Sequence, residues 1–313
     1  MAIKSGSIIA GRYHVEKPIS ENGGTASVYL CGLTDDIKRK VAIKFARSDA
    51  MGKMQEDTLL ELEADFLSKR EVRHPGIIRV HPIMLDGRSP VYSLRAIDVA
   101  DSPRFMVMDY LPGGSLAETM KKISGFPIGW KMDMYYQLLT AISHLHILGF
   151  GHRDLKPENI VFRDPVTPHT MPVPILIDFA LTSNGVTKYE VVEASHTLAY
   201  ASPERLLKSL GYDDLPPYPL EADIWSLGVI LYELITGSHL IHGSENKVRT
   251  TIIRGAFEVE IESHQIESHS QVAKMVTKLI RKMLDPDPTK RPSVSFVLGT
   301  LEQLFPPPLL ASN

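Results

Sequence analysis

The run His152-Arg153-Asp154-Leu155-Lys156-Pro157-Glu158-Asn159 constrains this 313-residue chain more than any other feature. It places a carboxylate, a cation and an amide within two turns of backbone. Further along, the apolar stretch 175–177 ends in the acid Asp178, a pattern typical of a buried strand that presents a carboxylate at its end. These groups, in this order, indicate an active site rather than a charged loop that caps a helix.

These motifs resemble the catalytic loop and the metal-binding segment of eukaryotic-type serine/threonine protein kinases. In that family, phosphoryl transfer depends on positioning and on neutralising phosphate charge with Mg²⁺. The resemblance implies that Asp154 accepts or orients the substrate hydroxyl and that Lys156 steadies the γ-phosphate. Asn159 and Asp178 would hold the metal ions, so ATP and Mg²⁺, with Mn²⁺ as an alternative ion, are the implied cofactors. Lysine two places after Asp154 marks the serine/threonine class.

The run 41–44, Val-Ala-Ile-Lys, resembles the strand that supplies the family's phosphate-pairing lysine, here Lys44. That lysine needs a carboxylate on the following helix. Glu63 is predicted because Leu67, four residues on, then falls on the same helix face, where the family has an apolar spine residue. Glu61 is the alternative, and it would place Asp65 at the position of the spine residue. Without a partner, either glutamate would be one more solvated charge on the helix surface.

The glycine-rich loop matches less well. The family pattern G-x-G-x-x-G-x-V, counted back from Val28, meets Glu21, Gly23 and Ala26, with Gly24 added beside the middle glycine. Glycine allows backbone amides to approach phosphate oxygens closely. Gly23 and Gly24 are therefore expected at the tip of this ATP-binding loop.

The adenine site follows from the resemblance alone. It is expected to combine apolar side chains with backbone groups of the segment between the lobes. The implied residues are Val28 and Ala42 above the base, Val161 below it, Met108 at the gatekeeper position, and the backbone of Asp109 and Leu111 at the adenine edge.

Motifs after the catalytic loop resemble the scaffold of a protein-directed kinase. The run 197–204 is similar to the segment that closes the activation loop, with Ser202 in place of the alanine of A-P-E. The residues expected to act structurally are His152, Phe179, Glu204 paired with Arg291, and Asp223 beneath the catalytic loop. Small-molecule phosphotransferases lack this succession of motifs, so serine or threonine residues of a protein substrate are the expected acceptors.

Two departures bear on activity and its control. Ala180 replaces the glycine of D-F-G, at a penalty of ~1 kcal/mol wherever φ must be positive. In the family, the arginine at the position of Arg153 binds a phosphate on the activation loop. Candidate residues for that phosphorylation are Thr182, Ser183, Thr187 and Ser195. Counted back from Thr197, the position that often carries the phosphate is Glu193. Its carboxylate would either pair with Arg153 permanently or be solvated.

The expected fold is α+β and bilobal, with a β-rich N-lobe (1–110) carrying one key helix, an α-helical C-lobe (111–305) and a Pro-rich tail (306–313). Expected strands are 13–15, 27–30, 41–45 and 105–110; expected helices are 130–148, 224–236 and 272–284, with an earlier one carrying Leu59, Leu62, Phe66 and Leu67. Three stretches exceed the family's usual spacing: 86–103, 163–174 and 208–220. The second is rich in proline and is expected to be irregular and to loop away from the cleft.

Composition excludes some classes of protein. A net charge of −3 argues against nucleic-acid binding. Cys31 is the only cysteine, which excludes an internal disulfide and indicates a reducing, cytoplasmic location. We expect no membrane span, because no apolar run is long enough. Regulatory domains, fused or in a partner, are compatible with the family. Two alternatives remain: a pseudokinase that binds nucleotide or acts as a scaffold, suggested by Glu21, Ala26 and Ala180, and a more remote small-molecule kinase.

Overall fold

The computed structural model describes residues 3–20, 26–46, 53–85, 89–182, 198–212 and 220–306. The chain divides into two compact units: Met1–Pro112 with Asp178–Ala180, and Gly113–Ile177 with Leu181–Asn313. The predicted α+β class is confirmed, with strands concentrated in the first unit and helices in the second. Some residues named from the sequence lie outside the described ones: Glu21, Gly23, Gly24, Ser183, Thr187, Glu193, Ser195 and Thr197.

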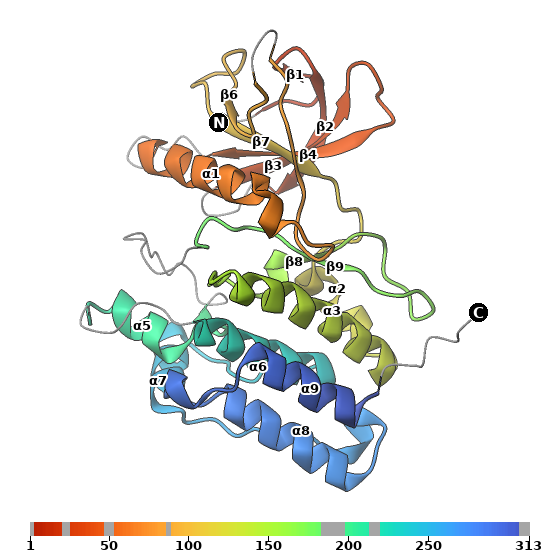
Figure 1. Cartoon of the computed structure of the whole chain (residues 1–313), viewed down its shortest axis with the longest axis vertical. Coiled ribbons are helices and arrows are strands. Elements are labelled where there is room, and N and C mark those ends of the chain that lie inside the picture. Colours follow the sequence, from red (N-terminus) through yellow and green to blue (C-terminus); the bar gives the residue numbers. More distant parts are fainter. Residues whose placement is uncertain are drawn as a thin grey trace. The chain divides into compact units, whose positions relative to one another are not determined.

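An antiparallel sheet forms the N-terminal unit (Figure 1). Its strands, in spatial order, are β1 (Ile8–Ile9), β2 (Tyr13–Ser20), β3 (Ala26–Leu33), β4 (Lys40–Ala46), β7 (Arg104–Asp109) and β5 (Val80–His81), and β6 (Leu94–Arg95) also pairs with β7. β-branched and aromatic residues of these strands, such as Val15, Ile43 and Phe105, are buried in one apolar core. Helix α1 (Lys53–Ser68) packs against β4 and β7, and the turn η1 (Arg70–Val72) follows it.

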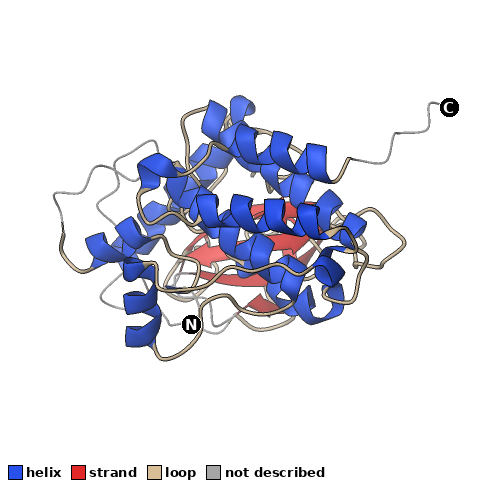
Figure 2. Cartoon of the chain, turned by 90° about the horizontal axis from the view of Figure 1, so that it is seen from below, coloured by secondary structure: helices blue, strands red, loops and turns tan. Residues whose placement is uncertain are grey.

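Helices dominate the C-terminal unit. They are α2 (Leu116–Ile123), α3 (Ile128–Ile147), α5 (Pro203–Ser209), α6 (Glu221–Thr236), α7 (Glu245–Arg254), α8 (Ser270–Met283) and α9 (Val294–Leu304). Short elements complete the unit: η2 (Pro157–Asn159), β8 (Ile160–Phe162) paired with β9 (Pro174–Leu176), η3 (Ser263–Ile266) and η4 (Pro288–Lys290). Helix α6 is mostly apolar and almost wholly buried, so it forms the centre against which α3 and α8 pack. Figure 2 shows the helices and strands of the chain in separate colours from a second direction.

The proline-rich stretch 163–174 has no helix and no strand before β9. It lies along α2 and α3, because three side chains of those helices donate to its carbonyl groups. Lys122 Nζ binds Val166 O (2.7 Å), Trp130 Nε1 binds Thr170 O (2.9 Å), and Gln137 Nε2 binds Pro172 O (2.6 Å). These bonds satisfy carbonyls that no regular element would pair.

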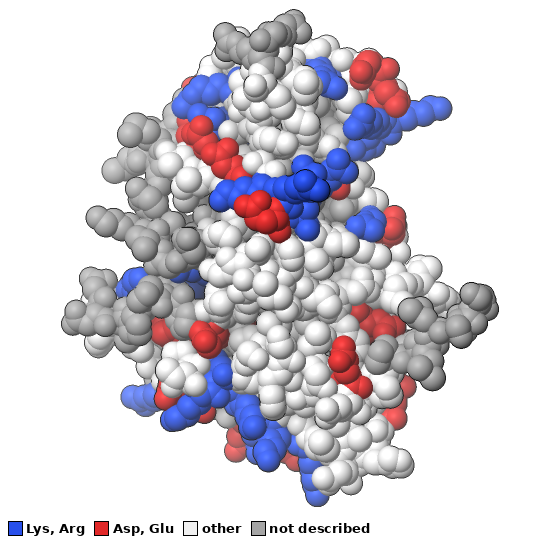
Figure 3. All heavy atoms as spheres, in the orientation of Figure 1, with Lys and Arg blue, Asp and Glu red and all other residues white. Residues whose placement is uncertain are grey.

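Charge is mixed on the face drawn in Figure 3, where Lys and Arg side chains alternate with Asp, Glu and broad uncharged areas. A continuous basic surface, which nucleic-acid binding requires, does not cover this face. Within the described residues, no helix has both the length and the apolar character needed to cross a bilayer.

Two serines at helix N-termini differ in what their hydroxyls do. Ser293, at the N-cap of α9, accepts a hydrogen bond from the N–H of Phe296 (3.2 Å). Ser202, at the N-cap of α5, makes no such bond, and its buried Oγ has no hydrogen-bond partner among the residues that the structure describes. One hydroxyl therefore stabilises its helix, while the other is a polar group desolvated without compensation.

We predict that Ser202→Ala raises the free energy of unfolding by about 1 kcal/mol, because it removes a buried, unsatisfied hydroxyl. The melting temperature should rise by roughly 2 °C, as measured by calorimetry. The matched control Ser293→Ala should lower stability by about 1 kcal/mol through loss of a cap. Destabilisation of equal size in both variants would contradict this reading of Ser202.

Candidate active site

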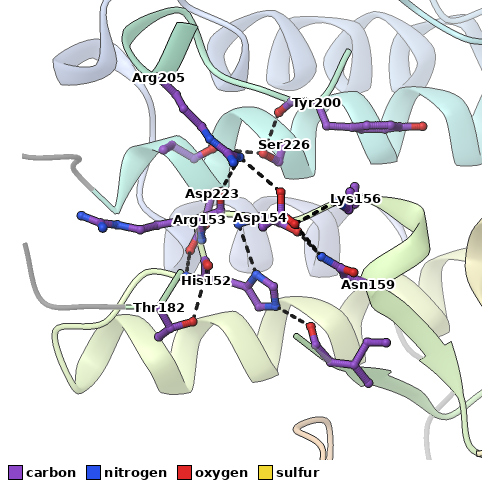
Figure 4. Close-up of polar contacts among 12 residues, drawn as sticks. His152, Arg153, Asp154, Lys156, Asn159, Thr182, Tyr200, Arg205, Asp223 and Ser226 are labelled. Carbon is purple, nitrogen blue, oxygen red and sulfur yellow. Dashed lines mark hydrogen bonds and ion pairs between the residues drawn. The ribbon is translucent and has the colours of Figure 1, made fainter. Parts of the chain in front are cut away.

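One buried carboxylate holds the start of the catalytic loop. Asp223, in the first turn of α6, accepts the N–H of His152 at Oδ2 and the N–H of Arg153 at Oδ1, both at 2.8 Å. His146 Nε2 lies 3.0 Å from the same Oδ2. Burial raises the pKa of Asp223, but His146 and these amides outweigh burial, so the pKa lies below its usual value. Asp223 is thus an ionised anchor beneath the loop (Figure 4).

The anchor stabilises an unusual backbone conformation. Arg153 has φ +67°, in the left-handed region that side chains other than glycine rarely adopt. The bond from its N–H to Asp223 helps to stabilise that conformation. Because the left-handed residue directly precedes Asp154, it sets the direction in which the catalytic carboxylate leaves the chain.

Three groups of the C-terminal unit surround Asp154. Lys156 Nζ is 2.8 Å from Oδ2, and Asn159 Nδ2 donates to Oδ2 (2.9 Å) and to the carbonyl of Asp154 (2.8 Å). Arg205 Nη1, from α5, lies 3.3 Å from Oδ1 (Figure 4). Burial raises the pKa of Asp154, but Arg205 and then Lys156 lower it, and the net pKa lies below its usual value. The structure thus brings together Asp154, Lys156 and Asn159 as the sequence suggested, and it adds Arg205.

Sequence reasoning missed Arg205 because it follows Glu204 in what reads as a scaffold motif, 51 positions beyond Asp154. An acid followed by a base in a short helix is common on protein surfaces and does not by itself predict a functional residue. The only signal available from the sequence was a basic residue beside an acid expected to be buried.

The catalytic loop is also tied to the strand that leads to Asp178. His152 Nε2 lies 3.0 Å from the carbonyl of Ile177, and the N–H of Ile177 donates to the carbonyl of Asn159 (3.0 Å). His152 is fully buried. The histidine therefore links the loop to the segment that follows β9.

A second polar cluster lies in the N-terminal unit. Lys44 Nζ is 2.7 Å from Glu63 Oε2 and 3.0 Å from Asp178 Oδ1. The other oxygen of Glu63 accepts the N–H of Phe179 (3.0 Å). Burial alone would lower the pKa of Lys44, but Asp178 and Glu63 raise it, so the ammonium stays charged.

The structure distinguishes the two candidate glutamates on α1. Glu63 is buried against Lys44, and Leu67 on the same face is buried too. Glu61 is exposed, and its carboxylate lies 3.1 Å from Arg104 Nη2. Helical periodicity explains the difference, since residues two apart on a helix point in different directions.

Backbone strain in the D-F-A segment lies at Asp178, with φ +64°, and Ala180 has no positive φ. Phe179 is buried and stacks on Phe66 of α1, with ring centroids 5.7 Å apart. In this conformation the alanine therefore bears none of the steric penalty expected from the sequence.

A salt-bridge network fastens α1 to the stretch 89–104, part of the long insertion. Asp57, buried on α1, lies 2.6 Å from Arg95 Nη2 of β6 and accepts the N–H of Arg104 (3.3 Å). Arg104 also binds Ser93 Oγ (3.0 Å). The insertion is thus bonded to the helix that carries Glu63.

The residues named for adenine occur in both units. On neighbouring strands of the N-terminal unit, Val28 lies opposite Lys44 and Ala42 lies opposite Met108. The N–H of Asp109 donates to the carbonyl of Arg79 (3.0 Å). The remaining two residues are Leu111, two positions after β7, and Val161, on β8 of the C-terminal unit.

An ion pair fixes the end of the activation segment. Arg291 Nη1 and Nη2 bind the two oxygens of Glu204, each at 2.8 Å, and the guanidinium lies 5.2 Å from the ring centre of Trp225. Ser226 Oγ donates to the carbonyl of Tyr200 (2.8 Å), as Figure 4 shows. Two-point geometry suits arginine rather than lysine.

The two residues named for a metal lie in different units, Asp178 in the N-terminal one and Asn159 in the C-terminal one. Each carries the kind of hard oxygen donor that Mg²⁺ prefers, a carboxylate in Asp178 and an amide oxygen in Asn159. Among the described side chains, no three from His, Cys, Asp and Glu gather as a metal cage. Magnesium commonly uses one or two protein carboxylates together with substrate phosphates, which such a sparse donor set suits.

Comparison with known proteins agrees with this geometry. The family model described as "Protein kinase domain" matches residues 13–301. The chain is 27% identical over 306 residues to the maternal embryonic leucine zipper kinase of Xenopus tropicalis, covering 96% of this chain and 40% of that protein. It is 27% identical over 292 residues to CBL-interacting protein kinase 11 of Oryza sativa subsp. japonica, covering 92% and 50%. Ribosomal protein S6 kinase alpha-4 of Mus musculus is 29% identical over 264 residues, covering 81% and 30%. The chain thus spans half or less of these relatives.

We predict that Asp57→Ala lowers the free energy of unfolding by about 2 kcal/mol, because it removes a buried carboxylate that pairs with the half-exposed Arg95 and accepts the N–H of Arg104. Amide hydrogen exchange should accelerate in residues 93–104 before it does so elsewhere. The control Asp65→Ala changes an exposed acid of the same helix. It should leave the free energy of unfolding within about 0.5 kcal/mol of the parent and the exchange of residues 93–104 unchanged. Unchanged exchange in residues 93–104 of Asp57→Ala would contradict a fastening role.

Proposed function

The chain belongs to the protein kinase domain family, as a catalytic domain of the serine/threonine type, and on this premise we propose that it transfers the γ-phosphoryl group of Mg-ATP to serine or threonine hydroxyls of proteins, its own included. The observation that carries the proposal is the ionised, oriented Asp154 with Lys156 and Asn159 on one carboxylate. A pseudokinase would be expected to have lost at least one such group.

In the proposed reaction, Asp154 accepts a hydrogen bond from the substrate hydroxyl and aligns its oxygen with the γ-phosphorus. Lys156, now paired with Asp154, would turn toward the γ-phosphate oxygens as negative charge develops on the transferring group. When bound, Mg²⁺ neutralises charge on the phosphates, and Asn159 and Asp178 are the residues that would hold it.

The N-terminal cluster would position the nucleotide. Lys44, charged and fixed by Glu63, would bind the α- and β-phosphates. Val28 and Ala42 would cover the adenine, and Val161 would lie on its other side. Since the N–H of Asp109 already donates to Arg79, we assign the adenine contact to the carbonyl of Asp109, with Leu111 supplying an N–H.

Partners and location belong to the same proposal. Protein substrates are favoured over small molecules by the Glu204–Arg291 and Asp223 contacts, which build the scaffold of a protein-directed kinase. Because the relatives are longer than this chain, regulatory domains fused to it or in a partner are proposed as well. We place the domain in the cytoplasm, a reducing compartment, since its one cysteine, Cys31, is a buried thiol.

The decisive experiment is incubation of the purified protein with Mg-ATP, with phosphosites mapped by mass spectrometry, followed by screening of a serine/threonine peptide library. Transfer to serine or threonine supports the proposal. Binding of ATP without transfer would instead identify a pseudokinase, and transfer only to a small-molecule acceptor would identify the remaining alternative.

We predict that Asp154→Asn lowers kcat by about 100- to 10,000-fold and leaves the Kd for ATP within about twofold, because Asp154 meets the hydroxyl and not the nucleotide. Lys44→Met should also lower turnover through poor phosphate placement, whereas its control Lys40→Met, on the same strand but exposed, should remain active. Retained turnover in Asp154→Asn, with contaminating kinases excluded, would refute the mechanism.

We predict that Ala180→Gly changes control more than chemistry. Glycine gains freedom in the unfolded chain and in alternative conformations, so stability should fall by about 0.5–1 kcal/mol. Activity should change by less than roughly threefold, and ligands that require an outward-turned Asp178–Phe179 segment should bind more tightly. Complete loss of activity in Ala180→Gly would show that the alanine is required.

A further inference from the structure

Arg205 is a buried cation close to the proposed catalytic carboxylate. Its side chain is only 9% exposed, although it lies in the first turn of the short helix α5. Burying a guanidinium is unfavourable unless charged or polar partners compensate for lost water. Two partners lie in the catalytic loop: Arg205 Nη1 donates to the carbonyl of Arg153 (2.7 Å) and lies 3.3 Å from Asp154 Oδ1 (Figure 4).

The first contact acts on the strained residue of the loop. The N–H of Arg153 is fixed by Asp223 from α6, and its carbonyl is fixed by Arg205 from α5. The left-handed backbone of Arg153 is therefore held at both of its hydrogen-bonding groups, by an anion on one side and a cation on the other. Such over-determination is what maintains a sparsely populated backbone conformation.

The second contact acts on the carboxylate itself. Arg205 Nη1 lies 3.3 Å from Oδ1 of Asp154, and Lys156 Nζ lies 2.8 Å from Oδ2, so each carboxylate oxygen has its own cation. If Lys156 turns to the phosphate during transfer, Arg205 is the cation that remains with Asp154.

Arg205 is in turn fixed relative to the helical core. Its neighbour Glu204 is bound at both oxygens by Arg291, so the start of α5 has little freedom. The guanidinium of Arg205 is therefore presented from a rigid element and not from a mobile chain. Rigid support of this kind is what a positioning residue requires.

We propose that Arg205 is a positioning residue for phosphoryl transfer, which clamps the left-handed turn at Arg153 and holds the Asp154 carboxylate in its orientation. This inference rests on the proposed function, in which Asp154 meets the substrate hydroxyl. It assigns a mechanistic role to a residue outside the catalytic loop and outside the nucleotide site.

The test compares Arg205→Gln, which removes the charge, with Arg205→Lys, which keeps the charge but not the planar guanidinium. For Arg205→Gln we expect kcat to fall by about 10- to 100-fold, because Asp154 is no longer held in position, while the KM for the peptide stays within about twofold. Arg205→Lys should recover part of kcat, because it can still place a cation beside the carboxylate. The Kd for ATP should stay within about twofold in both variants.

The assays use the full chain, Mg-ATP and the best peptide from the library, with thermal melting of every variant as a check on folding. The matched control is Arg249→Gln on α7, which breaks the pair between Arg249 and Glu245 (2.9 Å). It should leave kcat and KM unchanged. The backbone amide chemical shifts of Arg153 and Asp154, compared by NMR at one pH between the parent and the variants, give a readout that needs no turnover.

Each outcome bears on the inference. A parental kcat in Arg205→Gln, or unchanged amide shifts of Arg153 and Asp154, would overturn it. A loss of kcat that comes with a raised KM, a raised Kd for ATP or a lowered melting temperature would make Arg205 a merely structural residue and would overturn it too. If Arg205→Gln does not fold, Arg205→Lys decides: a lowered kcat at the parental KM supports the proposal, and a parental kcat contradicts it. Absence of Asp154-dependent transfer in the parent would instead refute the proposed function, and the amide shifts would still judge the contact.

Discussion

The carboxylate of Asp223 is the constraint on which the C-terminal half of the site depends. Two consecutive backbone N–H groups converge on it, which is possible only if the chain turns sharply between them. That turn places Arg153 in a left-handed conformation directly before Asp154. Because Asp223 is buried at the start of the central helix α6, the position of the loop is defined by the best-packed element of the unit.

The parts of the site that the sequence could predict are those encoded by short-range spacing. Asp154, Lys156 and Asn159 lie within six positions, so the local turn alone brings them together. Glu63 was separable from Glu61 because the helical period tells which residue shares a face with Leu67. Helix α6 was predicted for a similar reason, since its apolar residues form a long unbroken pattern.

The rest depends on tertiary contacts that no local pattern encodes. Strands β1, β5 and β6 have two residues each, and they exist only because β2 or β7 offers them a partner. The contacts of Asp57 join α1 to an insertion, and Arg205 reaches the catalytic loop from a distant helix. In each case the two members of the contact are far apart in sequence, and either would be an ordinary charged residue if its partner were elsewhere.

The bonds that hold residues 164–173 to α2 and α3 have a practical consequence for work on this chain. Surface loops with several prolines are usual places for proteolytic nicking and for inserted tags, provided that their backbone can leave the surface. Here three carbonyls are engaged by Lys122, Trp130 and Gln137, and Val166 is buried. A protease would have to break these bonds before it could bind the segment. This loop is therefore a poor insertion point for tags. A protease should not cut within it when the protein is digested under native conditions.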